Sequence, residues 1–132
     1  MDAIFWGGVF AFVSASVNAV KVLVRKSKIV GTPYEVGKRG EDYISKTRRL
    51  TKNKEVYQQT LSSKARIPDF IDKNRGILIE SKNVAKQSMT QQLKDFVGIA
   101  KANNWQMEMY VRQGTILSKN IDPFIKIKYF PW

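Results

Sequence analysis

The most informative segment of the chain is residues 66–84, which read RIPDFIDKNRGILIESKNV. Two stretches with strand character flank the tetrad KNRG, and this pattern predicts a β-hairpin with a four-residue loop. If Asp72 pairs with Ile77 across that loop, Asp69 lies opposite Glu80. Directly opposed β-carbons lie about 4.5–5.5 Å apart, and like charges there destabilise the pair unless a cation separates them. The hairpin therefore predicts two carboxylates that need a cation.

Lys82 belongs to the same predicted site. Because side chains alternate along a strand, Glu80 and Lys82 project to one face and Ser81 projects to the other. Two carboxylates suit Mg²⁺ or Mn²⁺, and the backbone carbonyl of Ser81 is a further candidate ligand. An adjacent lysine can orient or deprotonate the nucleophile, so the arrangement favours phosphodiester hydrolysis. The alternative is a solvated hairpin face on which Lys82 forms only a surface ion pair.

The rest of the chain predicts an α/β fold in which a small mixed sheet is flanked by helices. A capping box with a proline at the first helical position, Thr32 to Glu35, predicts a helix to about Leu50, and two glycines, Gly37 and Gly40, thin one side of it. A second capping box at 88–91 predicts an amphipathic helix that ends near residue 103. The expected strands are Glu55–Leu61, Ala65–Asp72, Ile77–Val84, Met107–Val111 and Ile125–Tyr129.

Composition limits the possible functions. The chain has 132 residues, which fits one domain of ordinary size, and its 23 basic and 11 acidic side chains leave a net charge of +12. Such an excess favours a polyanionic partner, either nucleic acid or an anionic membrane. The chain contains no cysteine and no histidine, which excludes thiolate nucleophiles, Ser-His triads and histidine-based metal nucleases. Carboxylates and lysines are left to perform any chemistry.

The N-terminal residues 1–30 form a separate part of the predicted organisation, ahead of a domain at 31–132. Residues 3–20 are uncharged and just long enough to span a membrane, and they are followed by a basic flank. A secretory signal would carry its positive charge before the apolar stretch, so a signal peptide is not expected. Three possibilities stay open for this apolar segment: a helix packed on the domain, a membrane-inserting helix, or a disordered segment.

Several motifs together resemble the PD-(D/E)XK signature of the restriction-endonuclease-like nucleases. The signature motifs are Pro68-Asp69, Glu80-Ser81-Lys82 and the upstream Gly37-x-x-Gly40-Glu41. The chain resembles in particular the nuclease toxin domains of bacterial polymorphic and contact-dependent growth inhibition toxins. That likeness covers roughly residues 34–118 and includes Arg66-Ile67-Pro68-Asp69, Glu80-Ser81-Lys82-Asn83, Ser88-x-Thr90-x-Gln92-Leu93 and Thr115-Ile116-Leu117-Ser118. Ser81 departs from the pattern, since the family more often has an apolar residue there.

The resemblance implies a restriction-endonuclease-like core with the order αβββαβ, and it implies roles for individual residues. Glu41, Asp69 and Glu80 would be ligands of a divalent metal or its outer shell, and Lys82 would act on water. Gln92 would contact a water on the metal or a substrate phosphate. Four basic residues are candidates for backbone phosphate contacts, although each is equally consistent with plain surface charge: Lys38, Arg39, Arg66 and Lys86.

The resemblance also implies a biological setting. The chain would be a metal-dependent endonuclease, secreted as part of a larger toxin, delivered to the target-cell cytoplasm and neutralised by an acidic immunity protein. Transfer RNA is expected ahead of DNA as its substrate. One alternative is a defence or repair DNA nuclease tethered to the cytoplasmic face of the inner membrane through residues 3–20. Another is a non-catalytic basic module that only binds nucleic acid.

Overall fold

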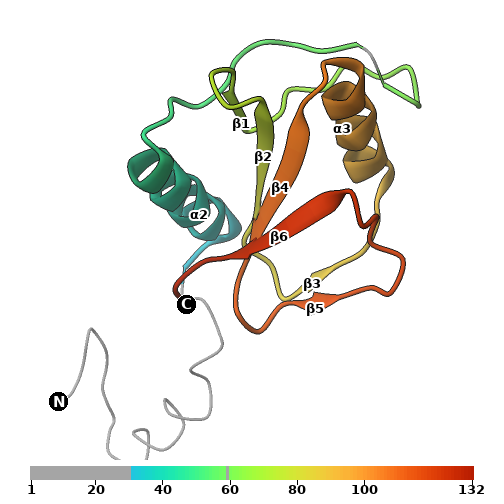
Figure 1. Ribbon diagram of the computed structural model, residues 1–132. Helices are drawn as coiled ribbons and strands as arrows, with labels where there is room; N and C mark the ends of the chain where they lie inside the picture. Colours follow the sequence, from blue (N-terminus) through green and yellow to red (C-terminus); the bar gives the residue numbers. More distant parts are fainter. Residues whose placement is uncertain (1–30, 59) are drawn as a thin grey trace, which may run out of the picture. The chain divides into compact units, whose positions relative to one another are not determined.

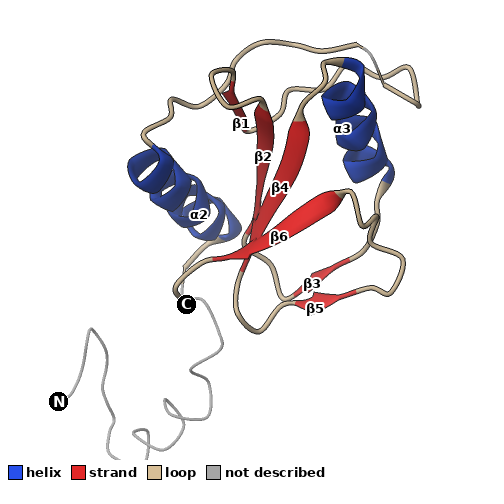
Figure 2. Cartoon of the chain, viewed as in Figure 1, coloured by secondary structure: helices blue, strands red, loops and turns tan. Residues whose placement is uncertain are grey.

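The computed structural model describes residues 31–58 and 60–132, and the predicted N-terminal helix and the boundary at residue 30 lie outside this part. The described chain forms a four-stranded mixed sheet between two helices (Figures 1 and 2). The sheet order is β1 (Phe70–Asp72), β2 (Ile77–Lys82), β4 (Gln106–Val111) and β6 (Ile125–Tyr129). β1 runs antiparallel to β2, and the other two pairings are parallel. The predicted class of fold is confirmed.

The helices α2 (Pro33–Arg48) and α3 (Gln91–Ala102) cover opposite faces of this sheet. Alternate residues of β2 separate the two apolar clusters: Leu78 packs with α3, whereas Ile79 packs with α2. With both faces covered, all of β4 after its first residue is buried, including the carboxylate residue Glu108. The predicted strand is confirmed, and its polar residues are buried along with its apolar ones: Glu108 forms an ion pair with Arg48.

The first helix begins as the sequence predicts. The Thr32 hydroxyl accepts a hydrogen bond from the Glu35 N–H, and the Glu35 carboxylate accepts one from the Thr32 N–H. Gly40 faces the sheet at a point where a β-carbon would lie 2.6 Å from the Ser81 hydroxyl oxygen and 2.9 Å from the Phe130 ring. Only glycine lets α2 approach β2 this closely, and this contact places the next residue, Glu41, near the hairpin.

The second helix begins two residues later than expected. Its cap is Thr90, whose hydroxyl accepts a hydrogen bond from the Leu93 N–H, and not Ser88. The expected apolar face is correct, and the helix ends at Ala102 with Asn103 as its C-cap, close to the predicted end. A short two-stranded parallel sheet, formed by β3 (Lys86–Gln87) and β5 (Ile116–Leu117), lies beside the main sheet. The three strands between the helices are thus β1, β2 and β3, which keeps the predicted order although the strand expected at 55–61 is absent and β3 was not predicted.

The expected strand at 55–61 does not form. Tyr57 packs against the core, but Val56 and Leu61 are 53% and 73% exposed, so the segment lacks the continuous apolar contact that a strand needs. The segment makes one isolated bridge, between Tyr57 and Arg66. The expected strand at 65–72 is reduced to its last three residues because Pro68 has no N–H to donate and Asp69 uses its N–H elsewhere, as described below.

None of the helices within residues 31–58 and 60–132 is long and apolar enough to cross a membrane. The apolar segment that prompted the expectation of a membrane contact, residues 3–20, is outside the described residues.

Candidate active site

The hairpin brings Asp69 and Glu80 together, as the predicted register requires. The ladder pairs Asp72 with Ile77 and continues to Phe70 and Ile79. Beyond that pair, side chains take over the hydrogen bonding: the Asp69 N–H donates to Glu80 Oε1 at 2.7 Å, and the Ser81 N–H donates to Asp69 Oδ2 at 2.9 Å. Each strand thus holds the carboxylate of the other, so both acids are fixed before any ligand arrives.

Glu80 is the most deeply buried acid of this cluster. Its side chain is buried, and burial raises the pKa of its carboxyl well above the ordinary value, with a further rise from the nearby Asp69 carboxylate. The ammonium of Lys82 opposes this effect, but its Nζ lies 3.7 Å from Glu80 Oε2, beyond ordinary hydrogen-bond distance. Burial and the neighbouring Asp69 thus disfavour the charged form of Glu80 more than Lys82 stabilises it, so a further cation would be needed to keep this carboxylate ionised.

Lys82 lies on the same face of β2 as Glu80, as expected. Its Nζ donates a hydrogen bond of 2.7 Å to Oε1 of Gln92, in the first turn of α3. The structure thus brings Gln92 to the predicted site, where it is a neighbour of the lysine ammonium. Ser81 projects to the opposite face, toward Gly40, which leaves its backbone carbonyl as the group to consider as a ligand.

Glu41 reaches the cluster through a residue that sequence reasoning missed. Lys52 Nζ lies 2.8 Å from Glu41 Oε2 and 2.7 Å from Asp69 Oδ1, so one ammonium bridges the helix acid and the hairpin acid. In the sequence, Lys52 is one of ten basic residues between positions 25 and 54, and nothing distinguishes it from its neighbours. Its position depends on the path of the loop after α2, which no local pattern predicts.

The oxygen atoms at this site are of the type that binds a hard divalent ion. Asp69, Glu80 and Glu41 offer only carboxylate oxygens, and the carbonyl of Ser81 adds a neutral oxygen, which is the ligand type that Mg²⁺ and Mn²⁺ prefer. Within residues 31–58 and 60–132, however, no three Asp or Glu side chains are gathered closely enough to form a ready-made metal cluster. Glu41 is joined to Asp69 through Lys52, not directly.

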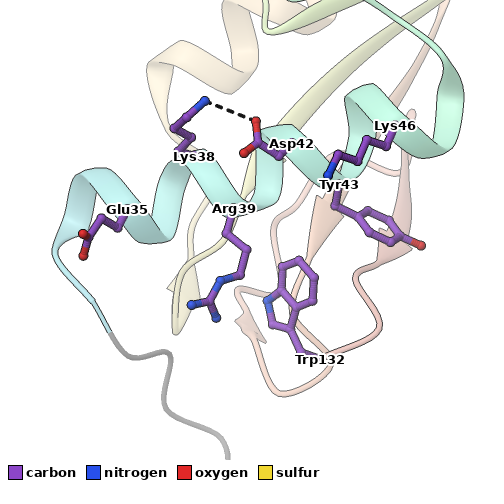
Figure 3. Close-up of a pocket in the computed structure, with 7 residues that line it drawn as sticks. All are labelled: Glu35, Lys38, Arg39, Asp42, Tyr43, Lys46 and Trp132. Atoms are coloured by element: carbon purple, nitrogen blue, oxygen red, sulfur yellow. Dashed lines mark hydrogen bonds and ion pairs between the residues drawn. The ribbon is translucent and has the colours of Figure 1, made fainter. Parts of the chain in front are cut away.

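The predicted phosphate contacts are spread over different surfaces. Arg66 donates from Nε to the buried Asp95 carboxylate, so it ties the loop before β1 to α3. Lys86 is exposed on the small sheet. Lys38 and Arg39 line a pocket of about 490 Å³ on the outer side of α2 (Figure 3). Their side chains point in different directions there, Lys38 toward Asp42 and Arg39 toward the side of Trp132. Phosphate binding by these four residues stays a prediction.

A mixed sheet between two helices, with paired carboxylates and a lysine on its antiparallel hairpin, defines the restriction-endonuclease class of fold. The chain belongs to the restriction endonuclease fold toxins: the family model described as restriction endonuclease fold toxin 7 matches residues 37–121. That range contains Glu41, the hairpin and Gln92. No curated protein and no solved structure matches the chain. The chain is therefore a toxin of the nuclease class, whose substrate is nucleic acid and whose site of action is the target cell.

Proposed function

We propose that this toxin is a divalent-metal-dependent endonuclease and that Asp69, Glu80 and Lys82 carry its phosphodiester hydrolysis. The observation that supports this most directly is the convergence of these three side chains, in which Glu80 accepts from the Asp69 N–H and lies 3.7 Å from the Lys82 ammonium. A solvated hairpin face would leave its carboxylate exposed, whereas Glu80 is only 2% exposed. Burying a carboxylate beside another one is costly unless a cation joins them.

Each residue has a role that follows from its position. Asp69 and Glu80, with the carbonyl of Ser81, would bind the ion, and Glu41 would be a further ligand or part of the outer shell of the ion. When bound, a divalent ion supplies positive charge to the developing phosphorane and lowers the pKa of the attacking water. Lys82 orients that water by hydrogen bonding, and Gln92 limits where the lysine ammonium can lie. No histidine is needed for this chemistry.

Transfer RNA is the proposed substrate, ahead of DNA. This choice follows the family resemblance, and the net charge of +12 suits either polyanion. The purified chain should be incubated with total tRNA and with plasmid DNA, each with Mg²⁺, with Mn²⁺ and with chelator. We expect cleavage of tRNA that requires the added ion and stops with chelator. Cleavage of plasmid alone would reassign the substrate, and binding without turnover would favour the non-catalytic basic module.

Two variants test the site itself. Asp69→Ala and Lys82→Ala should each abolish cleavage while the far-ultraviolet circular dichroism spectrum stays that of the wild type. Lys73→Ala is a matched control, since Lys73 lies on the hairpin loop and pairs with the exposed Glu55. Wild-type cleavage rates in both site variants would refute the assignment of these residues, whatever the substrate.

An acidic immunity protein is the proposed partner, because the net charge of +12 has to be complemented for fast and specific association. The product of the gene that follows the toxin gene should inhibit cleavage at a one-to-one ratio, and its association rate should fall as salt is raised.

For the proposed membrane contact, vesicles of anionic lipid should retain the full chain and release a chain that lacks residues 3–20; equal retention would remove that proposal.

A further inference from the structure

Lys52 holds a position that the proposed chemistry does not use. Its ammonium lies 2.8 Å from Glu41 Oε2 and 2.7 Å from Asp69 Oδ1. Both carboxylates are therefore already paired with a cation that the protein supplies. These two acids belong to the set proposed to surround a divalent ion. A positively charged group thus already lies between them.

The loop is constructed to hold Lys52 at this point. The N–H of the next residue, Asn53, donates to the Asp69 carbonyl at 2.8 Å, and the Asn53 side chain donates to the Pro68 carbonyl at 2.9 Å. The Lys52 ammonium also lies 5.9 Å from the centre of the Phe70 ring. The backbone around Lys52 is therefore attached to the same strand entry that carries Asp69, and its contact with the acid does not depend on the side chain alone.

The two lysines of the site differ in how easily they can leave. Lys82 is 19% exposed and is held by Gln92, whereas Lys52 is 42% exposed and makes both of its ion pairs at the edge of the site. Glu41, Asp69 and Glu80 carry one negative charge more than the two lysines neutralise when all are ionised. A divalent ion would reverse that balance, so electrostatic repulsion favours the departure of one ammonium, and Lys52 has the shorter path to solvent.

We propose that Lys52 is an internal cation of the active site: it pairs Glu41 with Asp69 until a divalent ion displaces it. The inference rests on the proposed metal-dependent function and adds a positioning residue to it. Lys52 keeps the two acids in place and competes with the ion for them. It follows that ion affinity is lower than the carboxylates alone would give, and that Lys52 becomes free when the ion binds.

Chemical labelling of lysines tests the displacement directly. The full chain should be treated briefly with an amine-reactive ester, with and without Mn²⁺, and the modification of each lysine measured by mass spectrometry. We expect labelling of Lys52 to rise severalfold with Mn²⁺, while labelling of Lys73, which pairs with Glu55 outside the site, stays constant. Equal labelling of Lys52 under both conditions would overturn the proposal.

Ion affinity provides the second test. Lys52→Met should bind Mn²⁺ about tenfold more tightly than the wild type in isothermal titration calorimetry, because the competing charge is gone. Lys52→Gln should behave in the same way, Lys52→Arg should stay close to the wild type, and Lys73→Met is the control for loss of one surface charge. Unchanged or weaker affinity in both neutral variants would overturn the inference.

Measurements on the wild type distinguish failure of the Lys52 role from failure of the metal-dependent nuclease function. If the wild type binds Mn²⁺ and cleaves nucleic acid but the neutral variants bind no more tightly, the internal-cation inference fails and the nuclease stands. If no variant binds Mn²⁺ while nucleic acid is still cleaved, both the metal dependence and the inference fail. If only the neutral variants bind the ion measurably, the inference is supported in its strongest form.

Discussion

Glu80 on β2 and Asp95 on α3 are both buried carboxylates, with exposed fractions of 2% and 0%, yet their surroundings differ in kind. Asp95 accepts hydrogen bonds from the N–H and the hydroxyl of Ser62, from Arg66 Nε and from the Gln91 amide. Burial alone would raise the pKa of Asp95, but these donors outweigh it and hold the pKa well below the ordinary value. Glu80 has one backbone donor, a second carboxylate beside it and a lysine at 3.7 Å.

This difference separates a carboxylate that serves folding from one suited to chemistry. The charge of Asp95 is fully satisfied, and its bonds attach the loop that carries Ser62 and Arg66 to α3. The charge of Glu80 is not fully satisfied by its neighbours, so this carboxylate can still bind a ligand. Perturbed acids of the second kind are enriched at functional sites, whereas acids of the first kind are ordinary structural partners.

The largest effect should come from Glu80→Gln. The change keeps an oxygen that can accept from the Asp69 N–H but removes the charge, so we expect cleavage to fall by at least about 10³-fold. Thermal stability should stay equal or rise, because the repulsion between neighbouring carboxylates is relieved. Cleavage assays and a thermal melt measure both effects. A large loss of stability together with intact cleavage would mean that Glu80, like Asp95, serves folding and not chemistry.

Asp95→Asn should show the opposite pattern. Removing one partner of a buried ion pair leaves Arg66 without its carboxylate, so the free energy of unfolding should fall by about 3 kcal/mol. Cleavage per folded molecule should stay close to that of the wild type. Urea denaturation at neutral pH measures the stability change. Asp42→Asn is the control, because its exposed pair with Lys38 should contribute less than about 1 kcal/mol.

The pH dependence of that difference is a third test. The folded-state pKa of Asp95 lies below its ordinary value of 3.8, so the carboxylate form stabilises the folded state. The stability gap between the wild type and Asp95→Asn should thus be fully present above pH 3.8 and shrink as the pH falls through and below that value. Urea titrations at neutral pH and at a series of acidic pH values follow the gap. A constant gap would mean that the Asp95 charge is not what stabilises this loop.

The smallest effect concerns two adjacent glutamines, one at each carboxylate site. Gln92 contacts Lys82, so Gln92→Ala should lower kcat by about tenfold with little change in KM, and Gln92→Glu should restore most of it by keeping an acceptor for the ammonium. Gln91 donates to Asp95, so Gln91→Ala should lower stability by about 1 kcal/mol and leave kcat unchanged. Equal kinetic effects of the two alanine variants would remove the positioning role of Gln92.

Local patterns predicted most of the elements. The Thr32 capping box, the hairpin loop and the apolar spacing of α3 depend on neighbours within a few residues, and each was found. The strand at 55–61 failed because strand formation depends on a partner and an apolar surface, and exposed Val56 and Leu61 have neither. The cap of α3 moved from Ser88 to Thr90 because two capping residues stand close together and tertiary packing selects between them.

The site was predictable only as far as the hairpin register reaches. Asp69 and Glu80 converge because strand pairing converts sequence distance into spatial distance, and Lys82 follows from the alternation of side chains. Lys52 and the Arg66 pair with Asp95 could not be predicted in this way. Both depend on the paths of the irregular segments 49–58 and 60–66, which are set by hydrogen bonds such as those of Asn53 to residues 68 and 69.

Trp132 contributes to the packing of the domain through a ring contact and a hydrogen bond. Its ring stacks on Phe130, and its indole N–H donates to the Asn83 side chain, which in turn donates to the Val36 carbonyl in the first turns of α2. Trp132 thus supports, through Asn83, the helix that presents Glu41. A substitution or label at Trp132 would disturb these contacts, so probes for following the toxin in cells are better inserted at the exposed tip around Ser63 and Lys64.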